Sequence, residues 1–440
     1  MTHSFRIETE WLDVADDEPV EQLTFAQISV HANGQIVTEL EDLIARTTRS
    51  GMRASAYRLA YWFAENWWRL RWEPEVNTIE WRLAHVMAAV GGGYAWPDIR
   101  FASDGLHVLV EARRTSGDKG APVRYLEGPP VQVAAEAFEI GIDDFVERVL
   151  ARLSSFKVLK TDLADLWAEV RSERADEAVY ALRQLEALLG FDAGEAPEDL
   201  IQGLFGSGES AGRKAVNEIA AAGKENAGRL VRAALESAEA SDVTIRLTSI
   251  PEVEALFRRQ ADMNALPWQR AELAARLARD VWGVHAGPVS NEVLSDLFQL
   301  SKDRLETGPV AALGIAAGLR RNRWDEAVSI VQRAKAPTGR RFEIMRLVAD
   351  HVVAPDGDHL LPITTARTDR QKFQRAFAAE FLLPFQEMCE QLGGLSFGEG
   401  EIRDDDIEDV AAQYQVSPLM VRTSLVNRGV LPREALGSAA

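Results

Sequence analysis

Hydrophobic and polar positions near the N-terminus follow a two-residue period, which is typical of β-strands. Apolar and polar residues alternate weakly over Leu23–Val37, and an Ala-Asn-Gly turn occupies 32–34. Two shorter strand-like runs, 98–102 and 106–112, flank the Ser-Asp-Gly turn at 103–105. Because alternation around an Asn-Gly or Asp-Gly turn favours a hairpin, both regions predict β-hairpins.

Helical spacing of apolar residues is found between these two hairpins. It covers Ser55–Arg71 and Ile79–Val90, and the glycine triplet at 91–93 ends the second segment. Together with the hairpins, these helices predict an α+β domain over residues 1–141.

The pattern then becomes mostly helical over residues 142–264, which we interpret as a helical middle region. The glycine-rich stretch 206–214 is not a phosphate-binding loop, because its spacing is wrong and no Lys-Ser/Thr pair follows its last glycine. We expect it to be a flexible loop before a helix. The other elements expected here are helices at 142–189 and 212–239, a loop at 190–197 and a short strand at 243–247.

Residues 265–440 also have helical periodicity, interrupted by short loops, and predict a mostly helical C-terminal domain. The expected helices are 267–282, 291–299, 324–334, 341–353, 369–391, 406–414 and 418–428.

The composition supports a globular chain and limits its partners. Of the 440 residues, 46% are apolar and 27% are charged, which suits two or three domains with real cores. The formal net charge is −19, so extensive nucleic-acid binding is disfavoured. Cys389 is the single cysteine, which excludes an intramolecular disulfide and fits a reducing cytoplasm. With no signal-peptide pattern and no apolar run of membrane-span length, we expect a cytoplasmic protein without membrane contact.

Four segments within Pro267–Leu431 resemble, in family order, the ImmA/IrrE family of bacterial metallopeptidases. The segments are ELAARLARDVWGVHAGPVSNEVLSDLFQL, GRRFEIMRLVADHV, RQKFQRAFAAEFLLPF and VAAQYQVSPLMVRTSLVNRGVL. The resemblance implies a zincin-like C-terminal domain. Active members of this family carry His-Glu-x-x-His on the second segment. Two His at i and i+4 reach one zinc ion from the same helix face, and the Glu acts as general base.

The residues that would form this zinc site have all changed. Aligned on Phe342, the two His positions fall on Arg346 and Asp350, and the Glu position falls on Leu347. The carboxylate expected from the third segment falls on Gln371. Arg stays protonated and offers no lone pair, and Leu is no base. We therefore expect no catalytic residue, no bound metal and no cofactor at this site.

The replaced residues can still interact. Arg346 and Asp350 have opposite charges and lie four residues apart on one helix face. One hypothesis is that they form an ion pair, with Gln371 nearby, in the space where zinc would lie. The alternative is an ordinary exposed helix pair.

The hairpin at 97–113 offers a competing function. Asp98, Glu111 and Arg113 resemble the motif of PD-(D/E)xK nucleases, in which two carboxylates hold Mg²⁺ and a Lys steadies the attacking water. Arg113 is a poor substitute for Lys, because Arg does not give up its proton. The other interpretation of this segment is a hairpin without catalytic chemistry.

The last two expected helices resemble a helix-turn-helix. Ser417 is a good N-cap residue, and Arg422, Asn427 and Arg428 could face a DNA groove. The acidic run just upstream, 404–409, would repel phosphates. We favour the simpler interpretation, in which these helices complete the C-terminal domain.

Six tryptophans gather between Trp62 and Trp96, and most are expected to build the first domain's core. Trp67 and Trp68 are adjacent on a helix, so they cannot point the same way. At least one of them is a candidate for an interface with the next domain or with a partner.

The leading functional expectation is a non-catalytic bacterial protein that regulates or interacts through a peptidase-like domain. By resemblance, its setting would be mobile-element regulation, a toxin–antitoxin pair or anti-phage defence, and its partner a protein or peptide. The alternatives are the Mg²⁺-dependent nuclease and a DNA-binding regulator.

Overall fold

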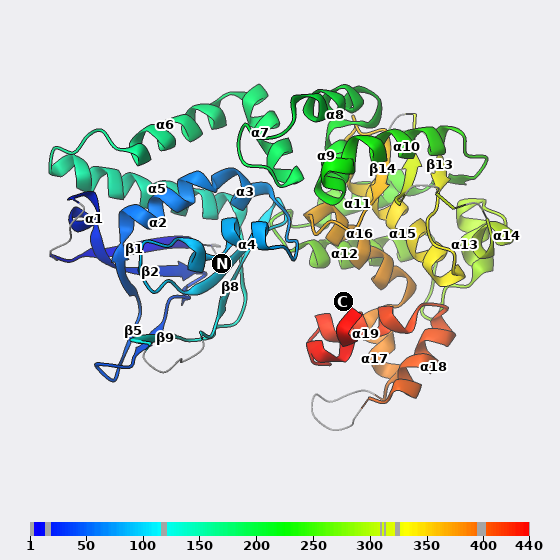
Figure 1. The fold of residues 1–440 in the computed structure, drawn as a ribbon. Coiled ribbons are helices and arrows are strands. Elements are labelled where there is room, and N and C mark those ends of the chain that lie inside the picture. The colour runs from blue at the N-terminus through cyan, green and yellow to red at the C-terminus, as the bar shows by residue number, and fades with distance from the viewer. Residues whose placement is uncertain are drawn as a thin grey trace. The chain divides into compact units, whose positions relative to one another are not determined.

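The computed structural model describes residues 4–13, 19–115, 121–308, 310–311, 314–321, 326–393 and 402–439. By its contacts the chain forms two compact units (Figure 1). The first unit consists of residues 1–201 and 367–369, and the second of 202–366 and 370–440. The boundary at Ile201 falls inside the region expected to form a separate helical part. The helices of that region are therefore divided between the two units.

The first unit contains an antiparallel sheet in which β2 is central. Its strands are β1 (Phe5–Trp11), β2 (Phe25–Ala32), β3 (Gln35–Ile36) and β6 (Met52–Ser55). The predicted hairpin is confirmed, because β2 and β3 pair across Asn33 and Gly34, whose φ angles are 47° and 82°. Buried and more exposed residues alternate along β1, so one face of the sheet packs against the core.

Two smaller sheets complete the strands of the first unit. One has the order β10-β8-β7 and the other the order β5-β4-β9. The hairpin predicted around the Asp-Gly turn is β7 and β8, in which Asp98 pairs with Arg113 and Arg100 with Glu111. The strand bounds are β4 (Leu40–Asp42), β5 (Thr47–Arg49), β7 (Asp98–Ser103), β8 (His107–Arg113), β9 (Val123–Tyr125) and β10 (Val131–Ala134).

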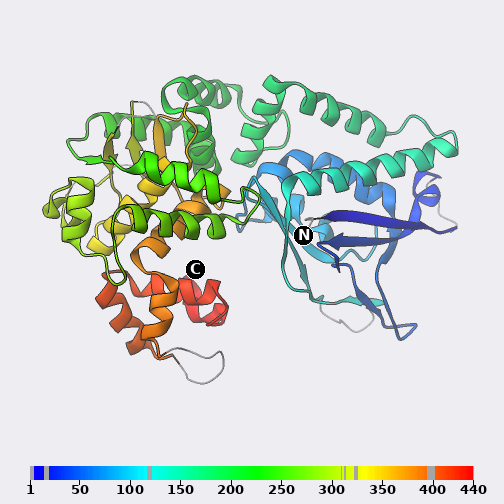
Figure 2. The ribbon, with the colours of Figure 1, turned by 180° about the vertical axis from the view of Figure 1, so that it is seen from behind.

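Helices cover one face of the β1–β2 sheet. Helix α5 lies across it, as the view from behind shows (Figure 2). The helix predicted over 55–71 is two helices, because Asn66 interrupts it and bonds through its side-chain amide to the Trp62 carbonyl. The helices are α1 (Pro19–Leu23), α2 (Ala56–Glu65), α3 (Trp67–Trp72), α4 (Ile79–His85), a 3₁₀ turn (Met87–Ala89), α5 (Ala135–Ser155), α6 (Asp162–Ala175) and α7 (Glu177–Leu189).

The second unit is built on an antiparallel sheet of order β11-β13-β12-β14. Its strands are β11 (Thr244–Arg246), β12 (Ala316–Leu319), β13 (Ala327–Val331) and β14 (Leu360–Ile363). The helix predicted at 324–334 is wrong for its described part, because the alternating Ala-Val-Ser-Ile-Val run forms β13. The mixed α+β class and the mostly helical C-terminal half are confirmed.

Most residues of the second unit are in helices. They are α8 (Glu198–Ala211), α9 (Arg213–Gly223), a 3₁₀ turn (Lys224–Asn226), α10 (Ala227–Glu239), α11 (Ile250–Gln260), α12 (Pro267–Val281), α13 (Asn291–Phe298), α14 (Lys302–Glu306), α15 (Pro337–Val353), α16 (Asp369–Leu382), α17 (Phe385–Gln391), α18 (Asp404–Tyr414), α19 (Pro418–Asn427) and a 3₁₀ turn (Arg433–Ala439). Residues 206–211, expected to be a flexible loop, belong to α8. None of the described helices is long and apolar enough to cross a membrane.

Helix α15 packs against the sheet through its apolar side, and Leu347 shows how close the contact is. Leu347 is 1% exposed, and a Cβ atom added to Gly318 of β12 would lie 3.2 Å from its Cδ2. A glycine at this position therefore makes room for the helix. Leu347 belongs to the large apolar cluster that the sheet, α15 and α16 share.

Close backbone packing in the first unit gives a testable prediction. A Cβ atom on Gly141 of α5 would lie 2.5 Å from the Phe5 carbonyl oxygen, so Gly141→Ala should destabilise the first unit by about 1–3 kcal/mol. Gly228 of α10 is a helical glycine with nothing within 4 Å of that position, so Gly228→Ala is the control and should cost no stability. Calorimetric unfolding would measure both. A Gly141→Ala protein as stable as the wild type would contradict the packing.

Candidate functional site

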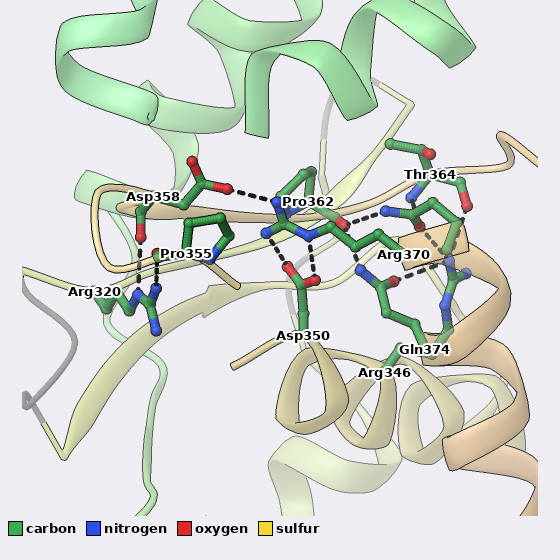
Figure 3. Close-up of polar contacts among 10 residues, drawn as sticks. Arg320, Arg346, Asp350, Pro355, Asp358, Pro362, Thr364, Arg370 and Gln374 are labelled. Carbon is green, nitrogen blue, oxygen red and sulfur yellow. Dashed lines mark hydrogen bonds and ion pairs between the residues drawn. The ribbon is translucent and has the colours of Figure 1, made fainter. Parts of the chain in front are cut away.

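The guanidinium of Arg346 lies at the centre of the four positions that the sequence resemblance aligns with a zinc site. From α15 its Nη2 donates to the Thr364 carbonyl at 2.9 Å, to Gln371 Oε1 at 2.6 Å and to Gln374 Oε1 at 3.2 Å (Figure 3). Arg346 is 8% exposed and both glutamines are fully buried. The structure thus brings together Arg346 and Gln371, two of the positions singled out in the sequence.

Gln371 binds the backbone edge of β14 as a neighbouring strand would. Its Nε2 donates to the Pro362 carbonyl at 3.0 Å, and its Oε1 accepts the Thr364 N–H at 2.9 Å. In an antiparallel sheet, a carbonyl and the N–H two residues later point to the same side of a strand. The carboxamide therefore satisfies both groups on the side of β14 that β12 does not occupy. Gln374 adds a further bond to the Pro362 carbonyl at 3.2 Å.

Asp350 does not pair with Arg346, so the hypothesis of an ion pair between them is wrong. Its partner is Arg370, whose Nε and Nη2 lie 2.6 Å and 2.8 Å from the two carboxylate oxygens (Figure 3). A two-point contact between a guanidinium and a carboxylate is stronger than a single bond. Arg346 and Asp350 share a helix face, but Arg370 approaches Asp350 from α16 and Arg346 turns toward β14.

Arg370 also joins a second buried carboxylate, that of Asp358. Its Nη1 lies 2.5 Å from Asp358 Oδ2. Asp358 accepts the backbone N–H of Ala215 as well, so it caps the start of α9, where Gly212 has no side chain to do so. Arg320 fixes the loop itself by donating to the Asp358 and Pro355 carbonyls at 2.9 Å and 2.7 Å.

The electrostatic surroundings of Arg370 and Arg346 differ. Burial opposes the charged form of Arg370, but Asp350 and Asp358 outweigh it and raise the pKa of this guanidinium. Burial lowers the pKa of Arg346 to about 9, and the positive charge of Arg375 acts in the same direction. Burial also raises the pKa of Asp358 above its ordinary value, against the effect of Arg370.

At the four positions that resemble the zinc site, the side chains are engaged in structural contacts. Arg346 cannot donate electrons to a metal, and Leu347 lies in the apolar core. Asp350 has both oxygens bound by Arg370, and Gln371 has both ends of its amide bound. Sequence reasoning missed Arg370, Asp358, Arg320 and Gln374. The position of Arg370, directly before Gln371, was the one available signal.

Comparison of the chain with protein families, with curated proteins and with solved structures found no match.

The nuclease-like residues form a charged row on the β7–β8 hairpin. Glu111 lies 2.8 Å from Arg100 Nη2 and 3.0 Å from Arg113 Nη2. Asp98 stands opposite Arg113 in the strand register. A carboxylate already neutralised by two guanidinium groups is a weak ligand for Mg²⁺, so this geometry does not favour the nuclease interpretation.

In the first unit, which includes residues 367–369, three side chains of types that can ligate a metal lie close together. One ligand atom each of Asp104, His107 and Asp369 lie within 4.8 Å of one another. Asp104 Oδ1 already accepts the N–H groups of Leu106 and His107, at 3.0 Å and 2.8 Å. These bonds close the turn of the hairpin, which accounts for Asp104 without a metal ion.

Basic residues at the end of the chain form ion pairs with acidic residues. Ser417 caps α19 by accepting the Met420 N–H at 3.2 Å, as predicted. Arg422 Nη2 lies 2.9 Å from Asp404 Oδ1, and Arg428 pairs with Glu272. Val421 and Leu425 are fully buried in the core of the second unit. These contacts support the interpretation that α18 and α19 complete the domain.

Trp67 and Trp68 both pack inside the first unit. Their exposed fractions are 1% and 4%. Trp68 Nε1 donates to Glu173 at 2.7 Å, and the Arg174 guanidinium lies 4.4 Å from the centre of the Trp67 ring. Both rings therefore join α3 to the helices that follow α5, and neither is a free surface for a separate partner.

The buried ion group gives a second prediction. Arg370→Met would leave Asp350 and Asp358 buried without their cation, so the second unit should lose about 3–5 kcal/mol of unfolding free energy in urea. Lys302→Ala is the control, because it removes an ion pair with Glu292 in which both side chains are more than half exposed. It should cost at most about 1 kcal/mol. Equal small losses in both variants would show that the group contributes no more than a surface pair.

The charged hairpin gives a third prediction. Cleavage of labelled DNA should be the same with and without Mg²⁺ for the wild type, Asp98→Ala and Glu111→Ala. The reason is that Glu111 is already bound by Arg100 and Arg113. Mg²⁺-dependent cleavage by the wild type that both variants abolish would establish the nuclease instead.

Proposed function

We propose that the chain is a pseudo-peptidase: a non-catalytic protein whose second unit has a zincin-like, ImmA/IrrE-type fold and serves regulation or protein interaction. By resemblance to that family, its setting is the control of mobile elements, a toxin–antitoxin pair or anti-phage defence in a bacterial cytoplasm. The partner is a protein or peptide, and the net charge of −19 disfavours nucleic acid.

The observation that carries this proposal is the 2.6 Å contact between Arg346 Nη2 and Gln371 Oε1. The family motif assigns these residues, 25 positions apart in the sequence, to one zinc site. Their contact supports that assignment. The residue chemistry supports the loss of activity, because a guanidinium placed at a ligand position repels a metal cation and cannot coordinate it.

The bonds of Gln371 also restrict how a partner could bind. Many peptide-binding domains hold an extended peptide by pairing it with a free strand edge. At β14 that pairing is already made by Gln371 and Gln374. A partner therefore binds at another surface, or it must first displace two fully buried glutamine side chains.

Metal content is the direct test. Wild-type protein purified without chelators should contain far less than one zinc ion per chain and should not hydrolyse peptides after zinc is added. Zinc bound in a one-to-one ratio, and lost on changing Arg346 or Gln371, would overturn the proposal.

Restoring the motif tests the fold assignment separately. The variant Arg346→His, Leu347→Glu, Asp350→His, Gln371→Glu should bind about one zinc ion per chain, because it rebuilds the ligand set on the same two helices. The matched control keeps Arg346 and carries the other three changes, and it should bind none. A folded four-residue variant without zinc affinity, judged by circular dichroism and zinc titration, would contradict the zincin-like geometry.

A further inference from the structure

Helix α8 contains three glycines that its surroundings do not require. A Cβ atom on Gly203 or Gly206 would have nothing within 4 Å, and one on Gly208 would meet only the Arg213 Cα at 3.8 Å. Their φ angles are not in the left-handed region, because Gly194 and Gly212 are the only glycines between 191 and 222 with positive φ among the described residues. Alanine would therefore fit at all three places.

These glycines lower the stability of the helix. Glycine is among the least favourable residues inside a helix, because it loses the most backbone freedom when it becomes ordered. Ser207 adds to the effect, since its hydroxyl donates to the Gly203 carbonyl at 2.8 Å, a back-bond that competes with the helical pattern. Ser210 makes a similar bond to the Ser207 carbonyl at 3.2 Å.

Packing holds α8 only lightly. Ile201, Leu204 and Ala211 are its buried apolar residues. Only three of the 14 residues of α8 are buried, against six of 13 in α7 and six of 11 in α9.

Helix α8 lies at the boundary between the two compact units. The chain passes from the first compact unit to the second between Ile201 and Gln202, inside the first turn of α8. Left-handed glycines stand on both sides of the helix, Gly194 with φ 81° and Gly212 with φ 95°. A helix that is weak by composition, lightly packed and placed at the boundary has the properties of a hinge.

We propose that α8 is a helical hinge, which unfolds locally while the two units on either side of it stay folded. Its opening requires breaking few buried contacts, and its three glycines hold the closed helix near the threshold of stability. The proposal is independent of the peptidase assignment, because it uses no residue of that site.

Hydrogen exchange of the full chain tests the hinge. In the wild type, amides of 202–210 should exchange faster than those in the middle of α7 and α9. The variant Gly203→Ala, Gly206→Ala, Gly208→Ala should slow exchange in α8 on the order of a hundredfold, at about fivefold for each substitution, and leave α7 and α9 unchanged. The matched control is Gln202→Ala, an exposed non-glycine residue of the same helix, which should change exchange about twofold or less.

Limited proteolysis supplies a second measurement on the same proteins. A glutamate-specific protease should cut the wild type at the exposed Glu209 and cut the triple variant more slowly by a similar factor. Wild-type α8 protected as strongly as α7 and α9 would overturn the proposal. So would a triple variant whose exchange is unchanged in α8, or slowed equally in α7 and α9.

Discussion

The guanidinium of Arg370 is the group on which the centre of the second unit depends. It lies between the carboxylates of Asp350, on α15, and Asp358, in the loop before β14. Asp358 in turn caps α9 through the Ala215 N–H. Buried charges are tolerated only when they are paired and hydrogen-bonded. One cation from α16 therefore fixes a second helix, a loop and the start of a third helix at the same time.

This pairing also explains what Arg346 does. Arg370 engages both oxygens of Asp350, and the Glu343 carboxylate accepts the backbone N–H groups of Arg333 and Ala334, so neither acid of α15 is the hydrogen-bond partner of Arg346. The Nη2 of Arg346 instead donates hydrogen bonds to neutral oxygens of Thr364, Gln371 and Gln374. The two cations thus have different surroundings, one between acids and one among amides. Their pKa values accordingly move in opposite directions, up for Arg370 and down for Arg346.

Local patterns in the sequence predicted those parts of the fold that local chemistry decides. The Asp-Gly turn of the β7–β8 hairpin and the Ser417 cap of α19 are examples. Strand β14 was missed because Leu360–Ile363 is a short run buried throughout, with no alternation to distinguish it from a helix. The family resemblance placed Arg346 and Gln371 at one site, and the two side chains are in contact. The pairing of Asp350 with Arg370 was not predicted, because helical spacing says which residues share a face and nothing about what a second helix brings to them.

The positive charges of Arg346 and Arg370 at the centre of the second unit belong to side chains and not to a bound metal ion. A bound metal ion can leave, be exchanged for another metal or be removed by a chelator. A guanidinium is attached to the backbone and keeps its charge at every physiological pH. The positive charges of Arg346 and Arg370 therefore have no loaded and empty forms.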